Sequence, residues 1–429
     1  MKKTTALILT LALALSLCAC TELETVSLPP LPTETPAAVE TRPVETAAPV
    51  ETETEIDAPP VIVSIKRTEM QEYDPQNGTV LILTFAYDTP TVYIEGSDAA
   101  AGINEYTSLL DESYYTGESY GGGEDSIYGY SNMLTLAEDN YGYLTNENIT
   151  DGMFELVSSR TVSVERLDAQ VLTLLYNDYS FTGGAHGFYG DRAYCFSTED
   201  GALLTLESLS SDTEKLKAAL LDTIVQMANS NMSILERIDQ TLLVDGDLSK
   251  TLATVIRDGS WYFGREGMVI FSDLYEISSY AAGPIEFTVP YDQLVGVIDD
   301  KWIPAAQEES CEFSAVSAEE MAGGSTVILD KLTVDAEGEE LYLVSKGRAT
   351  DVKLTRVDYT DNAFYETADL WYCSDMTNCA LQLVTMIPDG MPNLKLSYTD
   401  KDGRHELLLT QSGEDGSFIL TDDNIEAVG

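Results

Sequence analysis

YNDYSFTGGAHGFYGDRAYCFSTEDGALLTLESL, residues 176–209, is the stretch of this 429-residue chain that decides its fold. Apolar and polar residues alternate before and after a central run of glycines, and this spacing predicts two β-strands. The run from Thr182 to Gly187 predicts a tight turn, because glycine adopts backbone conformations that other residues avoid. An Asp-Gly pair at 200–201 marks a second turn. The stretch therefore predicts antiparallel strands that lead toward a helix.

Segments on both sides of this stretch continue the same pattern. Residues 153–166 and 169–181 predict a long antiparallel pair of strands. Residues 210–230 predict a helix, because their apolar side chains recur every three or four positions. We therefore expect residues 61–301 to form an α+β domain, an antiparallel sheet with helices packed on one side.

Residues 323–429 show no comparable helical pattern. Their alternating apolar segments are joined by turn pairs such as Asp402-Gly403, which predicts a small C-terminal all-β domain of the sandwich-like type. Residues 302–322 are then the linker between the two domains. We expect the run DKDG at 400–403 to be a hairpin turn, because it lacks the further acidic residues of a calcium-binding loop.

The first residues have the pattern of a bacterial lipoprotein signal. Lys2 and Lys3 precede an apolar run that ends in Leu-Cys-Ala-Cys, with Cys20 as its last residue. We expect residues 1–19 to be the signal peptide and Cys20 to carry the lipid that anchors the chain to the membrane. Residues 20–60, rich in Pro, Thr and Glu, predict a disordered tether. The expected location is extracytoplasmic, on the cell membrane of a bacterium.

The charge of the chain is strongly one-sided. Its 23 Lys and Arg residues stand against 73 Asp and Glu residues, which gives a formal net charge of −50. Such a field repels nucleic acid and raises the encounter rate with cationic partners. Solubility alone also explains an acidic composition. We expect no nucleic-acid partner, and a protein partner would be basic.

Two segments carry a resemblance to a known family. Residues 176–209 resemble the hallmark of the RsiV-like family, the extracytoplasmic domain of a lysozyme-sensing anti-sigma factor, in which a Thr-Gly-Gly-Ala-His-Gly turn joins two strands. Residues 267–294, GMVIFSDLYEISSYAAGPIEFTVPYDQL, resemble the closing strands of the same domain. The resemblance covers residues 148–300. Residues 61–146 match more weakly a companion region that also precedes some peptidoglycan deacetylase domains.

The resemblance implies an α+β ectodomain that binds a ligand and catalyses nothing. In the regulator the ligand is lysozyme, a strongly basic protein. This chain departs from the regulator because it begins with a lipoprotein-type signal instead of a cytoplasmic segment and a transmembrane helix. The sequence therefore favours a lipid-anchored envelope protein that binds a cationic protein such as lysozyme, or a wall glycan of the peptidoglycan. A structural envelope protein is an alternative.

Candidate binding residues lie in two places. Around the glycine turn they are Gly184, His186 and Tyr189, where the turn holds the histidine at a corner of the sheet. In an acidic, tyrosine-rich stretch they are Tyr114, Tyr115 and Tyr120, because tyrosines beside carboxylates suit contact with a basic surface. No cofactor is expected.

One motif raises a catalytic alternative. Residues 117–121, GESYG, fit the G-x-S-x-G pattern of a serine hydrolase, with Ser119 as its nucleophile and His186 among the two available bases. A nucleophile elbow needs an apolar strand before it and a helix after it, and neither is predicted here. An envelope hydrolase that uses Ser119 or His186 is therefore the less favoured hypothesis, and we expect no catalytic residue.

Four cysteines follow Cys20. Cys373 and Cys379 flank the loop-like run SDMTN and are a possible disulfide pair in an exported protein. Cys195 and Cys311 are equally compatible with two buried thiols. With two histidines in the chain and no Cys-x-x-Cys pair, we expect no metal site.

Overall fold

The structure is a computed structural model that describes most of the chain after residue 58. The predicted signal peptide, Cys20, nearly all of the predicted tether and Tyr120 lie outside the described residues. None of the helices within the described ranges is both long enough and apolar enough to cross a membrane. The described ranges are 59–76, 78–119, 126–146, 155–322, 326–360, 363–387, 391–412 and 416–422.

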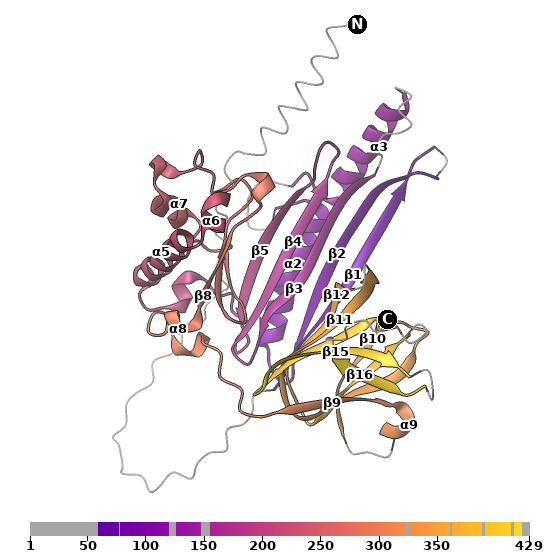
Figure 1. Cartoon of the computed structure of the whole chain (residues 1–429). Coiled ribbons are helices and arrows are strands. Elements are labelled where there is room, and N and C mark those ends of the chain that lie inside the picture. Colours follow the sequence, from indigo (N-terminus) through magenta and orange to yellow (C-terminus); the bar gives the residue numbers. More distant parts are fainter. Residues whose placement is uncertain are drawn as a thin grey trace, which may run out of the picture.

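The largest element is a sheet to which both halves of the chain contribute (Figure 1). In its N-terminal half all neighbouring strands are antiparallel except β2 and β3. A parallel pair needs a long crossover connection between its strands, and here two helices provide it. The strands are β1 (Val61–Tyr73), β2 (Leu81–Ile94), β3 (Leu156–Leu167), β4 (Val171–Phe181) and β5 (Phe188–Ser197), and the helices are α2 (Ala99–Thr116) and α3 (Tyr130–Asn146).

Helices α2 and α3 lie on one face of this sheet (Figure 1). Ile103 of α2 is fully buried against strand residues such as Val63 and Leu174. Met133 of α3 is fully buried beside Phe85 of β2. Each helix is therefore held by the apolar stripe that its own periodicity produces.

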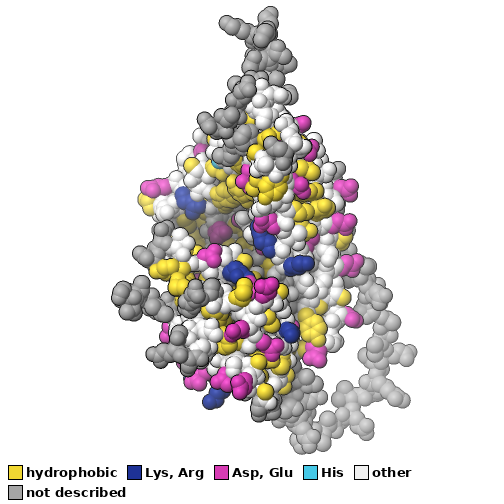
Figure 2. Space-filling view, turned by 90° about the vertical axis from the view of Figure 1, so that its right-hand side faces the viewer, with side chains coloured by type: hydrophobic (Ala, Val, Ile, Leu, Met, Phe, Trp, Pro, Cys, Tyr) yellow, Lys and Arg dark blue, Asp and Glu magenta, His cyan; other side chains and the backbone are white. Residues whose placement is uncertain are grey.

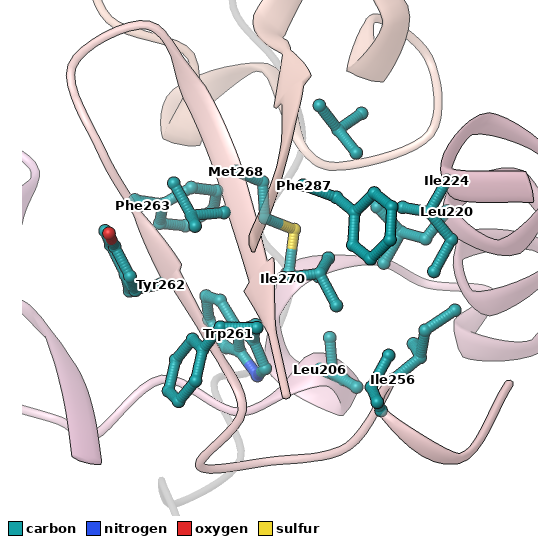
Figure 3. Packing of buried hydrophobic residues seen from close by; sticks show 14 of the residues in the cluster. Leu206, Leu220, Ile224, Ile256, Trp261, Tyr262, Phe263, Met268, Ile270 and Phe287 are labelled. Carbon is teal, nitrogen blue, oxygen red and sulfur yellow. The ribbon is translucent and has the colours of Figure 1, made fainter. Parts of the chain in front are cut away.

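The opposite face of β4 and β5 carries a second layer, a three-stranded antiparallel sheet with its own helices (Figure 1). Figure 3 shows its core, in which Leu220 and Ile224 of α5 point toward Phe287 and Met268. The Asp212 carboxylate caps α5 by accepting a hydrogen bond from the Lys215 N–H at 3.0 Å. The elements are α4 (Leu206–Leu209), α5 (Thr213–Ser230), α6 (Met232–Arg237), η1 (Val244–Gly246), α7 (Leu248–Thr254), β6 (Trp261–Phe263), β7 (Gly267–Phe271), η2 (Tyr280–Ala282), β8 (Glu286–Pro290), α8 (Tyr291–Leu294) and η3 (Asp300–Trp302).

Where the structure describes it, the C-terminal region is all-β apart from one short helix, and a single long strand, β11, contributes to both of its layers. The first residues of β11 pair with β9 and β13, and its later residues pair with β12 and β14, so that β11 contributes to two layers. Leu341, Leu354, Trp371 and Leu396 are buried between these layers. The elements are β9 (Cys311–Ser317), α9 (Ala318–Met321), β10 (Val327–Thr333), β11 (Glu339–Thr360), β12 (Ala363–Thr377), β13 (Cys379–Thr385), β14 (Leu394–Asp400), β15 (Gly403–Gln411) and β16 (Phe418–Asp422).

The α+β class and the sandwich-like C-terminal region predicted from the sequence are confirmed. The two halves of the chain are not separate domains joined only by a linker, because they share a sheet. Strand β1 pairs with β2 on one side and with β12 on the other, so one sheet runs through both halves. Residues 302–322, interpreted above as a linker, contain β9 and α9.

Candidate functional site

The glycine turn that opened the sequence analysis joins β4 to β5. The two strands pair in register from Val171 opposite Ser197 to Ser180 opposite Phe188. Gly183 and Gly184 have φ values of 91° and 103°, which side chains larger than hydrogen disfavour. A Cβ on Gly187 would lie 2.5 Å from the Tyr179 ring, so the ring packs directly on the backbone. The glycines of this motif therefore shape the corner of the sheet.

His186 is held in the turn by stacking and by a hydrogen bond. Its ring lies on the ring of Tyr280, with centroids 3.9 Å apart and an interplanar angle of 25°. The His186 Nδ1 atom lies 2.9 Å from the Gly187 carbonyl oxygen, which also accepts a hydrogen bond from the Tyr280 hydroxyl at 2.7 Å. Because a carbonyl oxygen only accepts, Nδ1 carries the proton. The imidazole is thus fixed, while the residue stays exposed.

Tyr280 comes from the segment between β7 and β8, and Arg237 stabilises that segment through hydrogen bonds to its backbone. The Arg237 guanidinium donates hydrogen bonds to the carbonyl oxygens of Ala282 and Pro284. The Ser278 hydroxyl donates to the Gly283 carbonyl oxygen. These bonds satisfy the irregular backbone around η2 and hold Tyr280 in position against the β4–β5 turn.

Two further tyrosines surround Tyr280. Tyr189 of β5 meets it edge to face at 5.9 Å between ring centroids, and Tyr275 lies 5.9 Å away at 34°. Tyr275 is 44% exposed and has a φ of 64°, a left-handed conformation that is uncommon outside glycine. We call His186, Tyr189, Tyr275 and Tyr280 the aromatic site.

Carboxylates lie beside the aromatic site. Asp191 is two residues after Tyr189 on β5 and therefore points to the same face of the sheet. Burial raises the pKa of Asp191, Asn177 and Arg192 oppose the rise, and Asp273 and Asp178 add to it. Burial, then the charges of Asp191 and Glu165, raises the pKa of Glu286 on β8. The acidic groups near the site are thus crowded and favour a nearby positive charge.

Two arginines neutralise one carboxylate next to Tyr275. Asp273 accepts hydrogen bonds from Arg192 at 3.1 Å and from Arg257 at 3.0 Å. Arg257 also pairs with Glu276 at 2.5 Å. This network fixes the segment that carries Tyr275, so we assign it a supporting role rather than one in ligand contact.

Tyr114 and Tyr115 do not belong to the aromatic site. The Tyr114 hydroxyl lies 2.9 Å from the Ser158 hydroxyl, and the Arg160 guanidinium lies 4.2 Å from the centre of the Tyr114 ring. Arg160 and Ser158 are on the face of β3 that α2 covers, whereas Tyr189 is on the other face. Tyr115 stacks on Tyr130 at 5.4 Å and is 39% exposed. The predicted set of binding residues is therefore split between the two faces of the sheet.

The structure places Ser119 just beyond the C-terminal end of α2. Gly117, with a φ of 77°, caps this helix, and its N–H donates to the Ser113 carbonyl oxygen at 2.9 Å. A nucleophile elbow requires the serine between a strand and a following helix. Ser119 instead follows a helix, so the local geometry does not match the hydrolase motif.

The possible disulfide between Cys373 and Cys379 is not formed, and both residues are free thiols. The run SDMTN is not a loop, because β12 continues to Thr377 in register with β11 and only Asn378 turns the chain. Burial raises the pKa of both thiols. Cys195 and Cys311 are also free and buried, and burial raises the pKa of each to about 11. Within the described ranges no group of three His, Cys, Asp or Glu residues could hold a metal ion.

Comparison with known proteins finds a family match for one region of the chain. Residues 213–292 match the sequence model of DUF3298, a protein family of unknown function. The matched residues run from α5 into α8 and include Tyr275 and Tyr280 of the aromatic site. They lie inside residues 148–300, and the RsiV-like relationship expected there from the sequence stays a prediction. No curated protein matches the chain.

Two crystal structures of DUF3298 proteins are distantly similar. The one from Bacteroides fragilis is 16% identical with a TM-score of 0.41, and the match covers 56% of this chain and 95% of that one. The one from Pseudomonas aeruginosa is 18% identical with a TM-score of 0.33, and the match covers 57% and 97%.

Sequence reasoning found three residues of this corner and missed two. Gly184, His186 and Tyr189 were selected from the first motif, and the structure brings them together. Tyr275 and Tyr280 were missed, although they are the two tyrosines of YEISSY in the second motif. The signal was that two motifs from distant parts of the chain each place tyrosines close to glycines.

Proposed function

We propose that this chain is a non-catalytic binding protein of the bacterial cell envelope, anchored through lipid on Cys20, whose ligand is a basic protein of the lysozyme type. The observation that carries the proposal is the aromatic site, where the exposed His186 and Tyr275 lie with the partly buried Tyr189 and Tyr280 beside carboxylates. Rigid tyrosines at an exposed corner are typical of residues that dominate protein interfaces. The acidic neighbours Asp191 and Glu286 select a positively charged partner.

The charge of the whole chain supports a basic partner. Figure 2 shows acidic side chains spread over much of one face, with a few Lys and Arg side chains gathered near its centre. A net charge of −50 attracts a cationic protein over several ångströms and raises its association rate. Binding should therefore weaken as salt screens the attraction. The lipid anchor is supported by the sequence pattern around Cys20.

The proposal is tested by titrating the full chain with c-type lysozyme in a calorimeter at low and moderate salt. A Cys20→Ser change keeps the protein soluble without lipid. We expect binding that Tyr280→Ala and His186→Ala weaken by at least tenfold, about 1.4 kcal/mol. Tyr93→Ala is the control, because Tyr93 is 55% exposed and lies on β2, away from the site.

Absence of binding at both salt concentrations would exclude lysozyme as the ligand. Retention on purified peptidoglycan that depends on Tyr280 would then favour a wall glycan at the same site. If Tyr280→Ala and Tyr93→Ala weaken lysozyme binding equally, the aromatic site is excluded as the place where lysozyme binds.

A further inference from the structure

A cavity of about 550 Å³ lies at one end of the C-terminal sandwich. Its lining comes from the β10–β11 connection, the end of β13, the residue before β14, the end of β15 and the start of β16. It shares no residue with the aromatic site, so the inference below goes beyond the proposed function and stands without it.

Asn393 lines this cavity, and its amide has an oxygen acceptor that is buried and lacks a donor within the described ranges. Its Nδ2 atom lies 2.6 Å from the Met386 carbonyl oxygen. A carbonyl oxygen only accepts, so the amide nitrogen must face Met386 and the amide oxygen must face elsewhere. The Asn393 Oδ1 atom is buried and has no hydrogen-bond partner among the described residues. A buried acceptor without a donor is costly, which makes a donating ligand favourable here.

Gln411 presents a second acceptor by the same reasoning. Its Nε2 atom donates to the Gly416 carbonyl oxygen at 3.0 Å, which leaves Oε1 to accept. The amide donors of Asn393 and Gln411 are therefore both directed at backbone carbonyls. The two side chains therefore favour a ligand that donates hydrogen bonds over one that accepts them.

The carboxylates of the lining have unequal roles. Asp335 accepts hydrogen bonds from the Thr385 hydroxyl at 2.9 Å, the Met386 N–H at 3.1 Å and Arg356 at 3.3 Å. Its charge is thereby matched by Arg356. Glu337 and Glu339 are exposed at the rim, and no ion pair between described residues includes either of them. The lining thus has unmatched negative charge.

The remaining wall is apolar. Met386, Ile387 and Phe418 line the cavity beside the acceptors. We propose that this cavity binds an ammonium group on an aliphatic stem, as in the side chain of a lysine residue. The apolar wall contacts the stem, while Glu337, Glu339 and the two amide oxygens offer four acceptors for the three N–H donors of the ammonium group.

The test uses the full chain with Cys20→Ser and two small probes, Nα-acetyl-lysine methylamide and its uncharged counterpart Nα-acetyl-norleucine methylamide. Binding is followed by NMR line shape and calorimetry. We expect the lysine probe to bind and the norleucine probe to bind at least tenfold more weakly. Glu337→Gln with Glu339→Gln should weaken the lysine probe by at least tenfold.

The matched control is Glu95→Gln with Glu308→Gln, which removes the same charge from exposed positions outside the cavity. It should leave affinity within about twofold. Circular dichroism of each variant checks the fold. Asn393→Ala is a second variant that we expect to bind the lysine probe more weakly. Equal binding of both probes, unchanged affinity in the Glu337 and Glu339 variant, or no binding of millimolar lysine probe would each overturn the proposal.

Discussion

The hydroxyl of Tyr372, on β12, accepts a hydrogen bond from the backbone N–H of Val164, on β3, although 208 residues separate them. Tyr372 is fully buried and packs in the same core as α2. The Val61 N–H likewise donates to the Ser374 hydroxyl at 2.7 Å. The C-terminal region therefore supplies part of the N-terminal core, and the two halves should unfold together.

Tyr372→Ala tests this coupling. The change removes a buried aromatic ring, and we expect the free energy of unfolding to fall by about 3 to 5 kcal/mol. Hydrogen exchange should speed up in β3 as well as in β12. Tyr365→Ala on the same strand is the control, since Tyr365 is 51% exposed. Loss of protection in C-terminal peptides alone would show that the halves unfold separately.

Gly187→Ala tests the packing of the β4–β5 corner. The added Cβ would stand 2.5 Å from the Tyr179 ring, so either the ring or the turn must move. We expect a loss of about 1 to 3 kcal/mol in the free energy of unfolding, measured by denaturant titration. Gly190→Ala on the same strand should change stability less, because its Cβ meets its nearest neighbour, Phe188, at 3.9 Å. Similar losses in both variants would contradict this packing.

Asp111 should make stability depend on pH. Burial raises its pKa from 3.8 to about 6, while Thr89 and Arg160 oppose the rise and Asp88 adds to it. The folded state thus holds a proton that the unfolded state has released, so the contribution of Asp111 is complete below pH 3.8 and is lost as pH rises through about 6. A shift of this size corresponds to on the order of 3 kcal/mol.

The measurement compares the wild-type protein with Asp111→Asn across pH 4 to 7.5. The difference in unfolding free energy between them should change in favour of the variant as pH rises. A constant difference would show that Asp111 does not titrate in this range. The comparison cancels the titration of the other carboxylates, which both proteins share.

The cysteines should behave as buried thiols. In native protein carrying Cys20→Ser we expect slow labelling of all four by a thiol reagent at pH 8, because burial raises the pKa of each. In denaturant all four should react quickly. A peptide map without reductant should contain no link between Cys373 and Cys379. Finding that link would contradict this prediction.

Local patterns predicted much of the fold because local physics determines them. The alternation around residues 176–197 predicted β4 and β5. The spacing of Leu216, Leu220, Ile224 and Met227 predicted the inward face of α5, on which the first three are buried and Met227 is partly buried. The pairing of β1 with β12 could not be predicted, because alternation shows which face of a strand is buried and not which strand lies beside it. The extension of β12 through SDMTN was hidden for the same reason.

The candidate site was predictable only in part. A glycine turn indicates an unusual backbone, which made His186 a reasonable choice. Tyr280 reaches it through contacts between two layers that sequence spacing does not reveal. Tyr114 was grouped with Tyr115 and Tyr120 because a sequence does not show what packs on a tyrosine of a helix. Here Arg160 covers its ring.

The position of β1 also determines how the protein bears mechanical load. This strand is the first element of the described chain, and it is flanked by β2 along its length and by β12 at Ile62 to Ser64. A pull that arrives from the N-terminal side runs along the strand axis. It strains the flanking hydrogen bonds in shear, all together, instead of opening them one after another. Under the proposed anchoring through Cys20, a pull on the chain therefore loads the hydrogen bonds on both sides of β1 in shear.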